Sequence, residues 1–193
     1  SGDGSVVVGL GWIDAGTAHA FRWQALSGMV DLGSTVAGAS CRANAVSGDG
    51  TRVVGWQAAS NGSWNGVYWE KGVQYPITTA SGGSVGDANA TNSDGSVIVG
   101  SSMGSQAWRW TQTTGAQGIG VLPGFNFRGY AFDLTEDGGT IVGTCGFGWD
   151  RDAFIWTAET GMLKLDTWLS DQGLDLAGWD LHTATGISDD ASV

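Results

Sequence analysis

Basic residues, histidine, cysteine and proline are all scarce in this sequence. Its 193 residues include 8 lysines and arginines against 19 acidic residues, with 2 histidines, 2 cysteines and 2 prolines. Phosphate neutralisation dominates nucleic-acid affinity, so a net charge of −11 argues against DNA, RNA and anionic membrane surfaces as partners. So few histidines and cysteines, without zinc or EF-hand spacing, predict no metal and no cofactor.

Long apolar runs are also missing. No run approaches the ~18 residues that a membrane-spanning helix needs, so we expect no span within this segment. Charged residues make up 14% of the chain and hydrophobic ones 41%, a balance that excludes disorder. The 34 glycines, with few lysines, glutamates and arginines, favour short strands joined by tight turns. We expect one all-β domain over residues 1–193.

Two short motifs recur along the chain with the same period. One is an Asp-Gly turn followed by a β-branched run, and its aspartates, spaced by 43 to 53 residues, are Asp3, Asp49, Asp94, Asp137 and Asp190. The other is a small residue followed by aromatic residues, ending in Trp23, Trp69, Trp110 and Trp156. Such periods indicate repeats of one supersecondary unit, here about 1–42, 43–87, 88–129 and 130–182.

Each repeat of ~45 residues predicts four strands. Asp-Gly makes the hairpin turn between the first two strands, because glycine accepts a positive φ. The aromatic motif is the third strand, and the glycine after it leads into the fourth. Four such sheets describe a β-propeller, with a stacked β-solenoid as the alternative. The recurring tryptophans are then core between the blades.

The two ends of the chain fall out of phase with the repeats. The sequence opens inside a motif, so we expect the protein's N-terminus to lie upstream. Residues 183–187 are a first strand that would pair with residues 6–8 and close a four-bladed ring, which leaves no exposed edge. We favour this ring over a fragment of a longer array. The alternative rests on Ala191-Ser192-Val193, which duplicates Gly4-Ser5-Val6 and starts a further repeat.

The fourth repeat is the longest and predicts one short helix near the C-terminus. Asp166 is a candidate N-cap, and Gly173 ends the helix. Leu165, Trp168 and Leu169 fall on one helical face. We interpret this segment as a plug over the ring.

The repeats resemble the HAF family of extracellular repeats. The motifs that carry the resemblance are His19-Ala20-Phe21-Arg22-Trp23, Gly28-Met29-Val30-Asp31-Leu32-Gly33 and Leu122-Pro123-Gly124. The resemblance implies a bacterial protein that is secreted or displayed at the cell surface, sometimes as an autotransporter passenger. It implies no catalytic residues. The Asp-Gly hairpins are also similar to those of WD-repeat and TolB-like propellers.

Aromatic residues in the variable loops are the candidate binding site. Four tryptophans follow the second strands, and loops after the fourth strands share that face, which adds Phe125, Phe127 and Trp179. Rings beside polar side chains form a platform for stacking sugars or gripping a protein. The competing interpretation is that these rings fold back over the blades. The candidate residues are Trp12, Asp14, Trp56, Asn61, Trp64, Trp149, Asp150 and Arg151.

Catalytic patterns are weak. Gly100-Ser101-Ser102-Met103-Gly104 fits the G-x-S-x-G pattern, but a strand rather than a helix is expected after it. Loop carboxylates for glycoside hydrolysis are present at Asp14, Asp87, Asp150 and Asp152, and nothing singles out a pair. Cys41 and Cys145 fall on the same face, and we favour two free thiols over a disulfide.

The sequence therefore predicts a secreted or surface-exposed module for binding or adhesion to a glycan or protein, rather than an enzyme. One alternative is a structural subunit of a surface filament or layer, in which copies bind one another. A second alternative is a glycan-degrading enzyme.

Overall fold

The computed structural model describes residues 1–104, 106–126 and 128–192, and this part of the chain is all-β with one short helix. The strands of the first two repeats are β1 (Val6–Trp12), β2 (Ala18–Gln24) and β3 (Gly28–Asp31), then β4 (Cys41–Val46), β5 (Arg52–Ala58), β6 (Trp64–Glu70) and β7 (Val73–Pro76). Those of the last two are β8 (Ala88–Thr91), β9 (Val97–Met103), β10 (Gln106–Thr111) and β11 (Gly115–Gly118), then β12 (Gly129–Leu134), β13 (Thr140–Phe147), β14 (Asp150–Thr157) and β15 (Gly161–Lys164).

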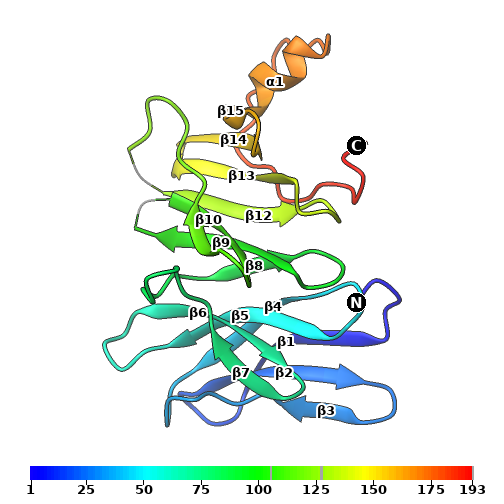
Figure 1. The fold of residues 1–193 in the computed structure, drawn as a ribbon, viewed down its shortest axis with the longest axis vertical. Coiled ribbons are helices and arrows are strands. Elements are labelled where there is room, and N and C mark those ends of the chain that lie inside the picture. The colour runs from blue at the N-terminus through cyan, green and yellow to red at the C-terminus, as the bar shows by residue number, and fades with distance from the viewer. Residues whose placement is uncertain (105, 127, 193) are drawn as a thin grey trace.

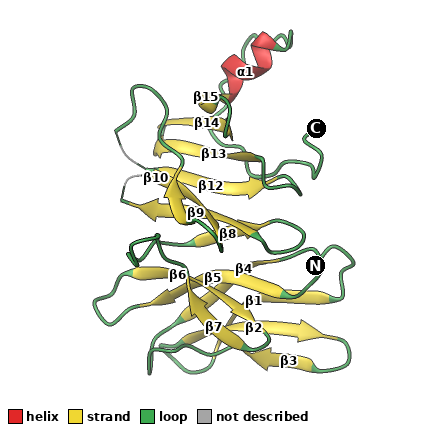
Figure 2. Cartoon of the chain, viewed as in Figure 1, coloured by secondary structure: helices red, strands yellow, loops and turns green. Residues whose placement is uncertain are grey.

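Each repeat folds into an antiparallel meander, which we call a unit. Sequential strands pair within units two, three and four, as the repeat pattern predicts. The pairing of Tyr130 with Ser101 joins units three and four into one sheet. Figures 1 and 2 show the units following one another along the long axis, from β1–β3 at the bottom to β12–β15 near the top.

The prediction of a closed four-bladed ring is wrong. Residues 181–189 lie against unit four, where Ala153 N donates to Leu181 O at 2.7 Å and Glu136 N donates to Asp189 O at 3.0 Å. The N-terminal unit and the C-terminal segment lie at different levels of the array (Figure 1). In the described residues β1 therefore has β2 as its only strand partner, and its sheet has three strands.

The physical reason is that the last segment packs on unit four as the start of unit three packs on unit two. Between units two and three, Gly66 N donates to Val85 O at 2.8 Å and Asp49 N donates to Ser93 O at 2.9 Å. The first bond corresponds in position to that between Ala153 and Leu181, and the second joins the same two turns as that between Glu136 and Asp189, with its donor one residue further along. The segment thus begins a fifth repeat on unit four instead of crossing to β1. Val193 lies outside the described residues.

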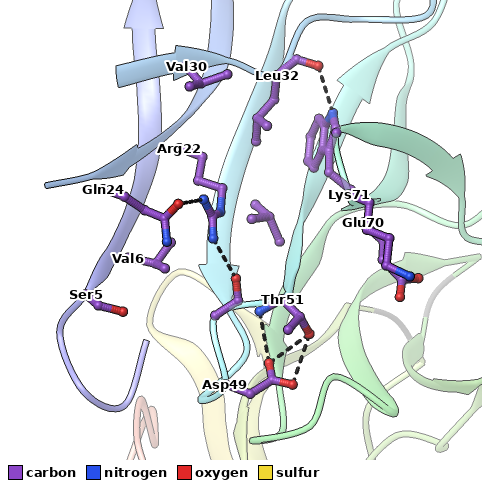
Figure 3. Close-up of a pocket in the computed structure, with 14 residues that line it drawn as sticks. Ser5, Val6, Arg22, Gln24, Val30, Leu32, Asp49, Thr51, Glu70 and Lys71 are labelled. Carbon is purple, nitrogen blue, oxygen red and sulfur yellow. Dashed lines mark hydrogen bonds between the residues drawn. The ribbon is translucent and has the colours of Figure 1, made fainter. Parts of the chain in front are cut away.

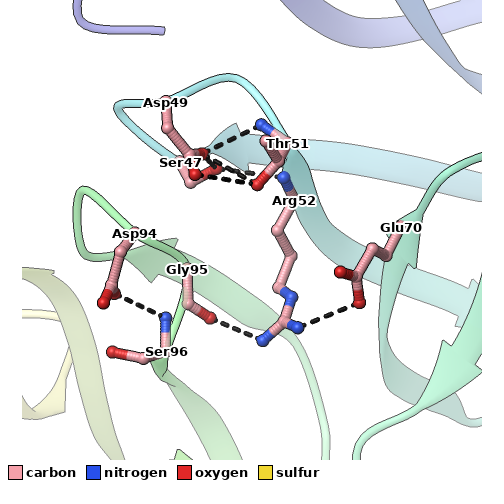
Figure 4. A network of polar contacts seen from close by, with 8 residues as sticks. All are labelled: Ser47, Asp49, Thr51, Arg52, Glu70, Asp94, Gly95 and Ser96. Atoms are coloured by element: carbon pink, nitrogen blue, oxygen red, sulfur yellow. Dashed lines mark hydrogen bonds and ion pairs between the residues drawn. The ribbon is translucent and has the colours of Figure 1, made fainter.

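The Asp-Gly turns form as the sequence predicts. In unit two, Asp49 Oδ1 accepts from the Thr51 backbone N–H at 2.9 Å and from the Ser47 hydroxyl at 2.5 Å (Figure 4). Gly50 sits at φ 73°, which a residue with a Cβ adopts only with strain. The carboxylate therefore satisfies the turn's donors, and the glycine allows its tight reversal.

At each of the three interfaces between units, an arginine of one unit donates a hydrogen bond to a carbonyl oxygen in the Asp-Gly turn of the next unit. Arg52 donates to Gly95 O at 2.7 Å and pairs with Glu70 at 3.0 Å (Figure 4). Its guanidinium also lies 4.7 Å from the Tyr68 ring centroid. Arg22 and Arg109 likewise donate to the turn carbonyls of Gly50 and Gly138. Some of the few basic residues therefore serve to join neighbouring units.

The core lies between neighbouring units and is built largely from the repeated positions. Trp69 and Trp110 are buried there, as predicted, and Trp156 is partly buried against the cluster between units three and four. Trp23 differs, because 37% of it is exposed. It lies on the outer face of unit one, where none of the described residues forms a preceding unit.

The predicted helix is present as α1 (Leu165–Asp171), but Asp166 does not cap it. The N-cap position is Lys164, whose ammonium pairs with Asp166 at 3.0 Å and with Asp152 at 3.1 Å. α1 packs on β14 and β15 at the end of the array, so it does not plug a ring. None of the described helices is long and apolar enough to cross a membrane.

Close approach of the first strand to the second requires glycine. A Cβ on Gly55 would overlap the backbone carbonyl oxygen of Arg42, whereas a Cβ on Gly11 would lie 4.0 Å from its nearest neighbour, the Phe21 ring. We expect Gly55→Ala to lower the free energy of unfolding by about 2–3 kcal/mol and Gly11→Ala to change it little, as measured by urea denaturation. Equal losses of stability in both variants would show that the approach of the Arg42 carbonyl to Gly55 does not require glycine.

The turn aspartates predict loss of stability in acid. Hydrogen bonds from the Ser1 hydroxyl and the Ser5 amide lower the pKa of Asp3 to about 2, and the same kind of bonds lower the pKa of the other four turn aspartates. A lowered folded-state pKa stabilises above the unfolded value of 3.8, and this stability is lost as the pH falls towards the folded value.

We therefore expect the melting temperature to fall as the pH drops from about 5 to about 2. Asp94→Asn keeps an acceptor for the Ser96 amide but does not titrate, so its melting temperature should depend less on pH. A variant with the same pH dependence as the parent would rule out Asp94 as a contributor.

Candidate functional site

The loops after the second strands and those after the fourth strands share one face, as predicted. Ala58, at the end of β5, donates its N–H to Ser40 O at 2.8 Å. Gly146, near the end of β13, donates to Arg128 O at 3.0 Å. Each bond joins the end of a second strand to the segment that follows a fourth strand. We call this side of the molecule the loop face.

Trp56 and Trp64 form a stacked pair on the loop face. Their ring centroids are 4.7 Å apart and the planes differ by 15°. Trp64 lies opposite Ala58 in the β5–β6 register, and Trp56 lies opposite Gly66, so the two rings are diagonal neighbours across the strands. Trp64 is 54% exposed and Trp56 is half-buried. Trp56 thus supports one face of an otherwise exposed ring.

A groove of about 540 Å³ opens beside Trp64. It crosses from unit two to units three and four, and this volume is in the range of small-molecule sites. The lining mixes two aromatic rings, those of Trp64 and Tyr130, with hydroxyl, amide and carboxyl groups. The polar side chains that line it belong to Ser63, Asn65, Ser84, Asp87, Ser102 and Tyr130.

Asp87 is the carboxylate among the described residues that line this groove. Burial raises its pKa, and the positive charge of Arg42 acts in the opposite direction. Arg42, Asp87 and Tyr130 occupy the same repeat position, directly before the aligned alanines Ala43, Ala88 and Ala131. One variable position of the repeat thus contributes a different chemical group in each unit.

The other predicted residues are spread over separate loops. Asp14 and Asn61 each accept hydrogen bonds within their own turn. Asp14 Oδ1 accepts from the amides of Gly16 and Thr17, and Asn61 Oδ1 accepts from the amide of Ser63. Trp149 is 94% exposed, and Trp12, Asp150 and Arg151 are exposed in units one and four. The structure brings Trp56 and Trp64 together, with Asn61 in the loop between them.

The other aromatic residues predicted on the loop face differ in their exposure. Phe125 is partly buried against the cluster between units three and four, whereas Trp179 is exposed. Phe127 lies outside the described residues. Cys41 and Cys145 are buried free thiols, and burial raises the pKa of each.

The G-x-S-x-G segment does not form a nucleophile elbow. Ser102 has φ 66° but is followed by Gly104 and strand β10 rather than by a helix. The two histidines are engaged elsewhere: His19 Nδ1 lies 2.9 Å from Asp31, and His182 Nδ1 lies 2.7 Å from Arg151 O. The described residues around the groove therefore include no histidine as a base for Ser102.

A second cavity, of about 530 Å³, lies between units one and two on the side of the Asp-Gly turns (Figure 3). Its arginine is already engaged, because Arg22 donates to Gln24 and to Gly50 O. Asp49 is engaged as well, since it accepts from Thr51. These contacts form the unit interface, so the groove beside Trp64 is the better candidate site.

Tyr130 and Ser84 line the groove but are not among the residues predicted from the sequence. Alignment of the repeats provides a signal for Tyr130, because it takes the variable position that holds Arg42 and Asp87. Ser84 lies in a loop without a repeated motif, and no sequence signal identifies it.

No protein-family model and no curated protein matches the chain. Solved structures match its fold. A putative TolB from Agrobacterium tumefaciens has a TM-score of 0.64 at 14% identity, over 97% of this chain and 65% of that one. TolB from Acinetobacter baumannii has a TM-score of 0.61 at 16% identity, over 85% and 41%. A prolyl endopeptidase has a TM-score of 0.54 at 16% identity, over 83% and 28%.

These likenesses show the fold, which is all-β and of the TolB-like β-propeller type. The chain spans less than two thirds of the length of each of these proteins. At such identities they assign no activity. The resemblance to HAF repeats stays a prediction.

Burial of Asp87 gives a prediction with a definite sign. A raised folded-state pKa stabilises below the unfolded value of 3.8, and this stability is lost as the pH rises through the folded value. The charged form therefore costs stability at neutral pH. We expect Asp87→Asn to raise the melting temperature at pH 7 and to lose this advantage below about pH 4.

The matched control is Glu159→Gln, which removes an exposed acid from the β14–β15 turn. Its melting temperature should follow the parent at every pH. A destabilised Asp87→Asn at pH 7 would mean that the carboxylate makes a favourable interaction that outweighs its burial.

Proposed function

We propose that this chain is a glycan-binding module whose site is the groove beside Trp64. The observation that carries the proposal is the exposed Trp64 ring, stacked on Trp56 at the rim of a groove lined with polar groups. A sugar has a face of C–H groups and an edge of hydroxyls. Trp64 offers a flat apolar surface to the former, and the groove offers hydrogen-bond partners to the latter.

The types of polar group support a ligand that is rich in hydroxyl groups and carries little or no charge. Hydroxyl groups of Ser84, Ser102 and Tyr130 both donate and accept, as sugar hydroxyls do, and Asn65 adds an amide. Asp87 adds an acceptor when it is ionised. The net charge of −11 disfavours a highly anionic glycan.

The stacked pair also limits the entropy cost of binding. Trp64 rests on Trp56, so its ring is held in one orientation before a ligand arrives, and less conformational freedom is lost on binding. A strand-borne site is more rigid than one on a loop, and both rings lie on paired strands β5 and β6.

In this proposal the chain works outside the cell or at the bacterial surface, where glycans are available. Support for that location comes from the resemblance to extracellular HAF repeats. A protein ligand is the second candidate, because stacked exposed aromatics also serve protein interfaces. Binding that needs a protein but no sugar would favour it.

Substitution of Trp64 tests the site directly. We expect the parent chain to bind a subset of an immobilised glycan panel, and Trp64→Ala to bind the same glycans about tenfold or more weakly, since a full stacking surface is lost. Titration calorimetry with the best glycan gives the dissociation constants.

Trp149→Ala is the matched control, because Trp149 is 94% exposed but lies in another loop. It should bind as the parent does. Equal losses in the two variants would place binding on a diffuse aromatic surface, and absence of binding to every glycan would overturn the proposal.

A further inference from the structure

We propose that the groove beside Trp64 takes a sugar residue with a free, protonated amino group, and that Asp87 accepts hydrogen bonds from this ammonium. The inference rests on the proposed glycan-binding function and names the class of glycan. It adds one positive charge to a ligand that otherwise presents hydroxyl and C–H groups.

The carboxylate of Asp87 makes no ion pair and no hydrogen bond with another described residue. Its backbone is held in place, because Asp87 O accepts from the Ser101 N–H at 2.9 Å. The side chain is half-buried, and burial raises its pKa more than the positive charge of Arg42 lowers it. A partly buried charge without a partner is unfavourable, so a ligand with a cationic donor would supply a missing interaction.

The other half-buried acids in the described part of the chain have partners. Asp87 differs from them, so its unpaired state is a local property of the groove and not a general property of this acidic chain. An ammonium in the groove would give Asp87 the kind of contact that these acids already make. The partners are Arg52 for Glu70, the Ile187 amide for Asp133, and Lys164 for both Asp152 and Asp166.

Backbone contacts bring the strand of Trp64 next to the segment of Asp87. Gly66, two residues after Trp64, donates its N–H to Val85 O at 2.8 Å. Val85 in turn lies two residues before Asp87. A Cβ on Gly66 would lie 2.4 Å from Gly86 O, so this close approach requires glycine. The indole ring of Trp64 and the carboxylate therefore line the same groove.

Neutral polar side chains surround the carboxylate and are available to a ligand. Those of Asn65, Ser84, Ser102 and Tyr130 line the groove and make no hydrogen bond with other described residues. Their amide and hydroxyl groups suit the hydroxyls of a sugar. Asp87 then takes the one charged group of the ligand, while the ring of Trp64 takes its C–H face.

Charge around the groove also favours a cation. The chain carries a net charge of −11, which attracts positively charged ligands to its surface. The face of the Trp64 ring attracts a nearby positive charge as well. Arg42 acts in the opposite direction. It is exposed, lies opposite Trp56 in the β4–β5 register and makes no ion pair with Asp87.

Matched sugars test the role of the charge. Disaccharides of the glucose and galactose series are compared by titration calorimetry, with one residue in its neutral, amino or N-acetylamino form. At about pH 6 the amine is protonated, whereas acetylation removes the charge and keeps the nitrogen. We expect the amino form of one series to bind about tenfold more tightly than the other two forms, because hydrogen bonds between charged groups are the stronger ones.

Asp87→Asn should abolish this preference. The variant keeps the shape of the side chain and an acceptor oxygen but loses the negative charge, so the three forms should bind it about equally. Asp150→Asn is the matched control. It removes one exposed carboxylate from the loop face outside the groove, and it should keep the preference of the parent.

Arg42→Gln should have an effect of opposite sign. It removes the positive charge that acts on Asp87, so the amino form should bind severalfold more tightly while the neutral form binds as it does to the parent. A loss of folding would weaken both forms together and cannot produce this selective gain.

Failure of this inference is distinguishable from failure of the glycan-binding function. If the parent binds the three forms equally and Trp64→Ala loses all of them, the inference is wrong and the glycan function stands. A preference for the amino form that survives in Asp87→Asn also overturns the inference. If no sugar binds the parent, both are wrong, and binding of a lysine-rich peptide in its place would indicate a protein ligand.

Discussion

Hydrogen bonds between Asp-Gly turns tie neighbouring repeats together, with the Asn92 side chain as the donor between units three and four. A donor in one turn reaches a carbonyl in the next, as Asp49 does to Ser93 and Glu136 to Asp189. The glycine in each turn permits the reversal, and the aspartate satisfies the turn's own donors. The core side chains fill the space between the units that these bonds join. Arginine side chains on turn carbonyls reinforce the same step, which explains how so few basic residues suffice.

Much of the fold is readable in the sequence, because period and turn chemistry are local properties. The Asp-Gly motif fixes the hairpins, and the aromatic motif fixes the third strands and most of the core. Ring closure is different. It depends on the small rotation between neighbouring units, which accumulates over the array and which no residue type encodes. Trp23 departs from the predicted burial for the same reason, since its burial requires a unit on the outer side of β2.

The candidate site, too, is predictable from the sequence only in part. Composition and loop position identify Trp56 and Trp64, but their stacking depends on a diagonal register across β5 and β6. Tyr130 reaches the groove only because unit four packs beside unit three. The scaffold thus brings variable residues of three units to one groove, while the repeated residues hold the units together. Catalytic patterns such as Gly100–Gly104 gain no histidine from this arrangement, because none lies among the described residues around the groove that holds Ser102.

The three interfaces between units share one contact, an arginine bonded to the turn carbonyl of the next unit, and this has an evolutionary consequence. Duplication or deletion of one whole repeat in the gene would leave every remaining interface with its normal partners. Array length can therefore drift between related proteins while the individual unit stays unchanged. A groove that draws on three consecutive units, by contrast, survives such events only when the breakpoint falls outside them.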